Sequence, residues 1–146
     1  MCLTYITERR APDSTVYTGY KFLALRLGSP ATAVMGTPIS FDKWIDCPVP
    51  YRVDTQLRTD TGAEYESGFH VYATREDAMK SGYYIHPADY KAYKVECTGI
   101  HTIGVENGRD PWIWCDVFVA RRIKVLSDES IPMIPFLTYS IDESMV

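Results

Sequence analysis

The sequence predicts an α+β domain: a mostly antiparallel, twisted sheet with one or two short helices. Three observations support this class. Segments rich in β-branched and aromatic residues dominate the chain, glycine and proline turn signals separate them, and one short segment begins with a helix-capping pattern. With 146 residues, 46% of them hydrophobic, the chain can bury a core of its own. We therefore expect one domain over residues 1–126 and an extended arm over residues 127–146.

The first half of the chain alternates one long strand with polar or turn-rich segments. Residues 15–27 are predicted as a long strand, and because neither of its faces is wholly polar we place it centrally. Ser40 is expected to cap a short turn of helix through Trp44 and Ile45. Residues 52–67 carry little apolar content, which is typical of a solvated loop or an irregular hairpin.

The second half is predicted to hold a hairpin of two long strands. The first begins near Tyr90, and the Asn107-Gly108 pair suits the tight turn that follows. The second runs over residues 112–126. Prolines interrupt residues 127–146, whose apolar side chains need a surface to cover. We expect that arm to lie on the domain or on a partner subunit.

A corner between strand and helix is the most informative local feature. Residues 68–73 alternate in the period of a half-buried strand. Thr74 is then placed to accept a hydrogen bond from the Asp77 amide, while the Asp77 carboxylate reaches back toward Thr74, a variant of the capping box. The pattern predicts a helix over residues 75–81, with Gly82 placed to end it.

This corner is also a candidate binding site, because His70, Tyr72 and Thr74 lie within one turn of it. The free amides of the helix start, with Arg75 beside them, can seat an anion. Ordinary strand-to-helix corners have the same chemistry without a ligand. His70 is a candidate general base, yet spacing places no second histidine or carboxylate beside it, and a structural hydrogen bond is the alternative role.

Composition excludes several classes of function. A net charge of −4 argues against general nucleic-acid binding, which needs surplus Lys and Arg to neutralise phosphates. No apolar stretch is long enough to cross a bilayer, and an apolar signal-peptide core is missing, so we expect a cytosolic protein without a membrane partner. The four cysteines and three histidines have no zinc-site spacing, so we expect neither a metal nor a cofactor.

Five short blocks in a fixed order together resemble a known group of proteins. They are the Met1-Cys2-Leu3 start, Tyr-x-x-Tyr-Lys at 17–21, Gly-Phe-His-x-Tyr-x-Thr-x-x-Asp-Ala at 68–78, Lys-Val-Glu-Cys-x-Gly at 94–99 and Val-x-Val-Ala-x-x-Ile-x-Val-Leu at 117–126. This order is similar to that of a mostly uncharacterised family of small proteins encoded by bacteriophages and prophages. The resemblance ends at Leu126, and residues 28–67 lie outside it.

The resemblance implies a phage accessory protein that acts on host defences in the cytoplasm of the bacterial host. One class of such proteins, the sponges, captures cyclic nucleotide or cyclic ADP-ribose immune messengers without catalysis. Capture needs aromatic faces for a base and a cation for each phosphate. We expect a homo-oligomer whose ligand-binding residues are Lys21, His70, Tyr72, Thr74, Arg75, Arg109 and Arg121.

Two alternatives stay open. The early Tyr17-to-Gly19 strand and the strand that leads into Thr74 are similar in order to ADP-ribosyltransferase-like folds, which implies a nucleotide-processing enzyme. Such enzymes place a carboxylate late in the sheet, whereas the late strand here has Asp116 at its start and Arg121 at its centre, so we lean against catalysis. The other alternative is an inhibitor that binds a host defence protein directly.

Overall fold

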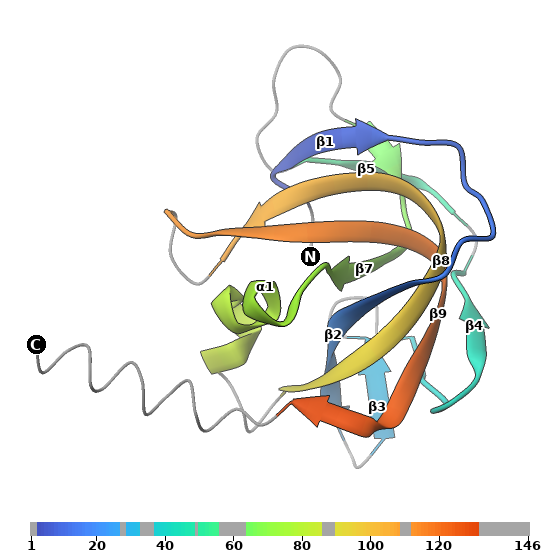
Figure 1. Cartoon of the computed structure of the whole chain (residues 1–146), viewed down its shortest axis with the longest axis vertical. Coiled ribbons are helices and arrows are strands. Elements are labelled where there is room, and N and C mark those ends of the chain that lie inside the picture. Colours follow the sequence, from blue (N-terminus) through green and yellow to red (C-terminus); the bar gives the residue numbers. More distant parts are fainter. Residues whose placement is uncertain are drawn as a thin grey trace, which may run out of the picture.

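Two long antiparallel strands organise the protein, whose structure is a computed structural model that describes residues 3–26, 29–32, 37–48, 50–55, 64–85, 90–108 and 112–131 (Figure 1). The strands are β1 (Tyr5–Arg9), β2 (Tyr17–Arg26), β3 (Ser29–Thr32), β4 (Trp44–Asp46), β5 (Arg52–Asp54), β6 (Glu64–Glu66), β7 (Phe69–Tyr72), β8 (Tyr90–Asn107) and β9 (Trp114–Ile131). The helices are α1 (Arg75–Lys80) and the 3-10 helix η1 (Gly82–Ile85).

The expected α+β class is wrong, because the described residues form mostly antiparallel sheet with one short α-helix. The helical turn expected after Ser40 is absent from residues 37–48. Asp42 instead adopts a left-handed backbone conformation with φ of 60°, and β4 follows it and pairs with β9. Pairing with a long neighbouring strand has overridden a local capping signal, as tertiary context often does.

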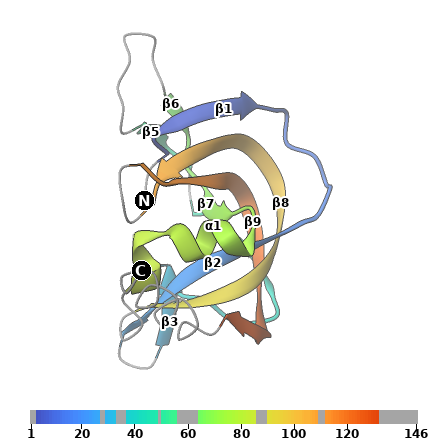
Figure 2. The ribbon, with the colours of Figure 1, turned by 60° about the vertical axis from the view of Figure 1, so that its left-hand side comes forward.

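The main sheet closes into a ring. β8 pairs with β2, β2 with β7, β7 with β9, and β9 again with β8. One edge of β8 is shared, because its first half pairs with β2 and its second half with β1. Figures 1 and 2 show β8 and β9 curving together around the molecule, with α1 beside the opening that they leave.

The bend of β8 has a local cause at Gly99. This glycine has φ of +68°, a left-handed conformation that favours glycine, and the register with β9 shifts between Ile100 and Thr102. A β-carbon at Gly99 would lie 3.1 Å from Cβ of Arg121 on β9. The bulge lets one strand turn enough to serve both β2 and β1.

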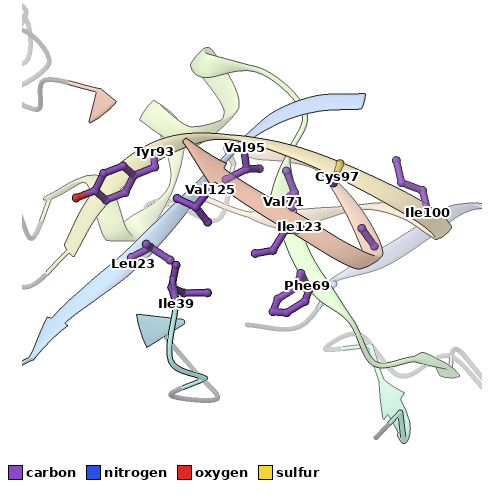
Figure 3. Close-up of a cluster of buried hydrophobic side chains, with 11 residues drawn as sticks. Leu23, Ile39, Phe69, Val71, Tyr93, Val95, Cys97, Ile100, Ile123 and Val125 are labelled. Carbon is purple, nitrogen blue, oxygen red and sulfur yellow. The ribbon is translucent and has the colours of Figure 1, made fainter. Parts of the chain in front are cut away.

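Two apolar clusters fill the protein, one on each side of β7. Phe69 and Val71 join one cluster, whereas Tyr72 joins the other. Figure 3 shows the first, in which Ile123 and Val125 of β9 lie close to side chains from β2, β7 and β8. The second cluster includes buried Ala78 of α1, so the helix covers that side.

Two predicted connections are confirmed in part: the hairpin of the two long strands, and the loop or irregular hairpin over residues 52–67. β8 and β9 pair as the predicted hairpin, but the tight turn expected at Asn107-Gly108 is wrong, because Asn107 pairs with Trp114 and residues 108–113 connect the strands. Gly108 donates its amide to the Ile113 carbonyl at 2.8 Å. β5 and β6 form a separate two-stranded hairpin within the polar segment.

Residues 127–131 of the expected arm belong to β9, and the rest of the arm lies outside the described residues. Among the described helices, none is long and apolar enough to cross a membrane.

Candidate functional site

The corner after β7 folds as its sequence predicts. Thr74 is the N-cap of α1: its Oγ1 accepts from the Asp77 amide at 3.1 Å and donates to Asp77 Oδ2 at 2.6 Å. Asp77 Oδ1 also accepts from the Asp116 amide of β9 at 3.1 Å. The helix ends at Lys80, one residue earlier than expected, because Ser81 already has an extended backbone. The cap therefore fastens α1 to β9.

The same geometry weighs against an anion at the corner. Thr74 and Arg75 are exposed to solvent, and α1 has only six residues. Its first turn already holds the side chains of Glu76 and Asp77, whose negative charges occupy the positive end of the helix. The role of Thr74 and Arg75 in binding stays a prediction.

His70, by contrast, lies in the interior. Its Nε2 is 2.9 Å from the Tyr65 hydroxyl, which also accepts from the Leu3 amide at 2.9 Å. Burial, and then the charge of Lys21, lowers the pKa of His70 to about 3. His70 is therefore neutral near pH 7, and it is a weak base.

Lys21 is buried beside His70, with only 5% of its surface exposed. Its Nζ donates to the His70 carbonyl oxygen at 2.9 Å, and none of the described carboxylates lies within ion-pair distance of it. Burial lowers the pKa of Lys21 to about 8, although the charge of Glu106 opposes the shift. An ammonium group has three donors, so a buried charge here has hydrogen-bonding capacity to spare.

Tyr72 and Glu106 form the other half of this interior group. The Tyr72 hydroxyl donates to Glu106 Oε1 and lies 2.8 Å from Ser81 Oγ. The second oxygen, Oε2 of Glu106, is buried and has no hydrogen-bond partner among the described residues. Burial raises the pKa of Glu106 to about 7, with the Tyr72 hydrogen bond and the charge of Lys21 opposing that rise. We call Lys21, Tyr65, His70, Tyr72 and Glu106 the interior polar cluster.

Arg121, another predicted ligand-binding residue, lies elsewhere. It is half exposed on β9 and makes two hydrogen bonds to Glu66, at 3.1 and 3.2 Å. That hydrogen bond lowers the pKa of Glu66. Glu66 Oε2 is also 3.5 Å from Nε2 of the buried His101. Arg121 is thus engaged in a surface ion pair, and Arg109 lies outside the described residues.

The structure therefore brings together Lys21, His70 and Tyr72, and it places Thr74, Arg75 and Arg121 at the surface. Sequence reasoning missed two members of the interior polar cluster, Tyr65 and Glu106. Tyr65 lies in a segment whose overall polarity predicts a solvated loop or an irregular hairpin, and so gives no sign of a buried side chain. Glu106 directly precedes the Asn107-Gly108 turn signal, although it alternates with Thr102 and Gly104 on the same face of β8.

Metal ligands and buried thiols are two further kinds of reactive group in the described part of the chain. No group of three His, Cys, Asp or Glu side chains there is arranged to hold a metal ion. Burial raises the pKa of both Cys97 and Cys115 to about 12, so these thiols stay protonated and unreactive.

The cluster can thus donate hydrogen bonds through Lys21 and accept them through Glu106, while its histidine is held by Tyr65. No family model, no curated protein and no solved structure matches this chain.

Proposed function

We propose that this protein captures a small nucleotide-type ligand, such as a cyclic nucleotide or cyclic ADP-ribose immune messenger, and does not cleave it. Its setting would be that of a phage accessory, anti-defence protein in the cytoplasm of a bacterial host. The observation that carries the proposal is the buried Lys21 ammonium, which makes one hydrogen bond to a neutral carbonyl and has no described carboxylate within ion-pair distance. A phosphate supplies the missing negative charge.

The neighbours of Lys21 support a ligand with both an anionic and a hydrogen-donating part. Oε2 of Glu106 lacks a partner among the described residues, so it can accept from a sugar hydroxyl or a base amine. The charge of Glu106 opposes the fall in the pKa of Lys21, and the charge of Lys21 opposes the rise in the pKa of Glu106, so the two groups share one region of the interior. A nucleotide offers phosphate, sugar and base within one small molecule.

Catalysis is disfavoured by the state of the candidate base. A pKa of about 3 makes His70 a poor proton acceptor near pH 7, and its Nε2 already faces the Tyr65 hydroxyl. Asp116, the carboxylate that an ADP-ribosyltransferase-like enzyme would have to use, is exposed at the third residue of β9. A bound ligand would meet hydrogen-bonding groups and no activated nucleophile.

The direct test is to incubate the purified protein with a panel of cyclic nucleotides and cyclic ADP-ribose isomers. The free ligand is measured, the protein is denatured by heat, and the supernatant is measured again. Capture predicts depletion of one ligand followed by its intact release. Release of a product would instead identify an enzyme, and no depletion of any ligand would contradict both readings.

Three single variants then locate the site. Lys21→Met keeps the length of the side chain, and we expect it to weaken capture by about 1.5–3 kcal/mol through loss of a charge-assisted hydrogen bond. Arg75→Ala and Arg121→Ala remove exposed cations and serve as matched controls for charge. A loss with Arg75→Ala alone would move the site to the corner before α1, and a loss with Arg121→Ala alone would move it to β9.

A second candidate function is binding to a host defence protein. It is favoured by large aromatic side chains at one end of the β8–β9 hairpin: Trp112 is 87% exposed, and the half-exposed rings of Tyr5 and Trp114 lie 5.5 Å apart. Exposed aromatic residues are enriched at protein interfaces. Substituting Trp112 and Trp114 by Ser should abolish host-protein binding while leaving nucleotide capture unchanged. The expected homo-oligomer is tested by the same variants in sedimentation experiments.

A further inference from the structure

The ring of strands has one weak junction. β2 pairs with β8 from Tyr17 to Ala24, and β7 pairs with β9 along its whole length. Between β2 and β7, however, the register contains the single pair Tyr20 and Tyr72. We call this junction, residues 19–22 of β2 and 70–72 of β7, the seam. A junction with one ladder pair opens more easily than its neighbours, because few backbone hydrogen bonds must break.

Side chains hold the seam where the ladder does not. Lys21 Nζ donates to the His70 carbonyl across it, and the rings of Phe22 and Tyr72 meet edge to face with centroids 6.0 Å apart. Gly19 allows the two strands this approach: a β-carbon there would lie 2.7 Å from the Tyr72 carbonyl oxygen and would also clash with Val71. The seam is closed by contacts that a ligand can replace.

We propose that the seam is the entrance to a binding site for a phosphate-bearing ligand, and that the phosphate takes the place of the His70 carbonyl as the partner of Lys21. The ligand class rests on the proposed function, whereas the entrance rests on the strand pairing. Opening the seam exposes the interior polar cluster, because Lys21, His70 and Tyr72 all belong to the seam itself.

The exchange of partners favours the bound state. A hydrogen bond from an ammonium to an anion is shorter and stronger than one to a neutral carbonyl. Glu106 is tied to the seam by the hydrogen bond that Tyr72 donates to its Oε1, and its buried Oε2 accepts a donor from the same ligand. The ligand thereby compensates the spare donors of Lys21 and the Glu106 Oε2 that has no partner among the described residues.

Chemical labelling of the full chain tests the entrance. Lys21 is labelled by reductive methylation, and Cys97 and Cys115 by iodoacetamide, under native and denaturing conditions. The protection factor of each side chain is its labelling rate in the denatured chain divided by that in the native protein. Because both thiols are fully buried, they report global unfolding. We expect the protection factor of Lys21 to be at least about ten-fold smaller than theirs. Equal protection factors would mean that Lys21 is exposed only by global unfolding. That result would overturn the proposal that the seam is an entrance.

Pyrophosphate and cyclic ADP-ribose are the probes for the ligand class. Either one should raise the protection factor of Lys21 by about five-fold or more at saturation, without changing the labelling of the exposed Lys80. Unchanged Lys21 protection with both probes would overturn the assignment of Lys21 as the phosphate partner. Equal protection of Lys80 would indicate non-specific ion binding and would overturn it too.

A pair of glycine variants tests the geometry. Gly19→Ala forces the strands of the seam apart, so it should lower the protection factor of Lys21 by about ten-fold while Cys97 changes less. Gly82→Ala is the matched control, because a β-carbon at Gly82 meets nothing within 4 Å. Equal effects of Gly19→Ala on Lys21 and Cys97 would contradict a local opening. If Gly19→Ala does not fold, the wild-type comparison of Lys21 with the thiols decides alone.

These results separate the entrance from the proposed function. Capture of a nucleotide with no change at Lys21 would leave the proposed function standing and overturn the seam as its site. Protection of Lys21 by pyrophosphate, with no nucleotide captured from the panel, would leave the phosphate site standing and overturn the proposed function.

Discussion

The β8–β9 hairpin and the β2–β7 seam close the same ring in opposite ways. The hairpin is paired from Asn107 and Trp114 at its turn to Ala92 and Ile131 at its far end, and apolar side chains fill its inner surface. The seam has one ladder pair and a lysine whose ammonium group bonds to a main-chain carbonyl. Burial of apolar side chains stabilises the folded state, whereas burial of a charge costs desolvation free energy.

This difference separates stability from binding within one small sheet. The hairpin carries much of the apolar burial that keeps the protein folded, whereas the seam combines apolar contacts with a buried charge that adds little to stability. Buried ionisable groups outside ion pairs are frequent at functional sites. The comparison therefore predicts that damage to the hairpin unfolds the protein, while damage to the seam changes its binding and its response to pH.

The largest effect is expected from Ile123→Ala in the hairpin. Ile123 is fully buried between Cys97 of β8 and Ile45 of β4, so the substitution leaves a cavity in the core. We expect the free energy of unfolding, measured in urea, to fall by about 2–5 kcal/mol. Val16→Ala is the control, because Val16 is about half exposed and its truncation should cost less than about 0.5 kcal/mol. Similar losses from both variants would refute the assignment of the hairpin as the stable region.

The second effect is a pH dependence caused by Glu106 beside the seam. Its pKa is raised to about 7 in the folded protein, from an ordinary value near 4.5, so the folded state binds a proton more tightly than the unfolded state does. Between pH 4.5 and 7 the contribution of Glu106 to stability therefore falls as pH rises. Its total over this range is at most about 3 kcal/mol.

Glu106→Gln isolates that contribution, because glutamine keeps an acceptor for Tyr72 and does not titrate. His70 acts in the opposite direction: its pKa is lowered to about 3, so its contribution rises with pH up to about 6.5. His70 is common to both proteins, and Lys21, with a pKa of about 8, titrates above this window. The difference in unfolding free energy between wild type and variant should shift against the wild type from pH 4.5 to 7. A constant difference would show that Glu106 does not titrate there.

A smaller effect is expected at the cap of α1, which packs against β2, β7 and β9. Thr74→Ala removes the oxygen that accepts from Asp77, at an expected cost of about 1 kcal/mol in urea unfolding. Thr74→Ser keeps the hydroxyl and should cost less. Because α1 lies beside the seam, Thr74→Ala should also speed the methylation of Lys21 more than the alkylation of Cys97. If the alkylation of Cys97 were accelerated more than the methylation of Lys21, the cap of α1 would not be stabilising the seam.

The smallest effect is expected from Arg121→Ala on the outer surface of the hairpin. The ion pair with Glu66 is partly exposed, and such pairs contribute about 0–1 kcal/mol. A double-mutant cycle with Glu66→Gln measures the coupling free energy directly. Since Arg121 lowers the pKa of Glu66, the coupling should vanish as pH falls below the ordinary range of a glutamate. A coupling that persists at pH 2 would contradict an ionic origin.

Local features of this fold could be predicted from the sequence because neighbouring residues decide them. The strand before Thr74, the cap itself and the start of α1 depend on groups within a few positions, and the Asn107-Gly108 pair marks the hairpin for the same reason. Long-range pairing could not be predicted in this way. Periodicity along β2 reveals a strand, yet it contains no information that β7 will close the ring.

The candidate site shows the same contrast between features that the local sequence predicts and features that depend on long-range strand pairing. Lys21, His70 and Tyr72 were identified as polar groups on predicted strands, but their burial follows from closure of the ring. Tyr65 escaped prediction because its segment is polar, although the side chain itself is buried. The α+β class was wrong for a related reason: the helical signal after Ser40 was local, and β4 forms because β9 extends beside it.

The bend at Gly99 has a consequence for the order of folding. It makes β8 the shared template on which β1 and β2 assemble, and β1 reaches Val105 from Tyr5, across most of the chain. Closing such long loops is slow until a local structure exists to receive them. We expect the hairpin to form first, with φ-values of roughly 0.5–0.8 for Val119→Ala and close to zero for Phe22→Leu. A newly made chain would then expose the apolar side chains of an incomplete sheet until β2 pairs with β8. The rate of that pairing would determine how long the chain is prone to aggregate.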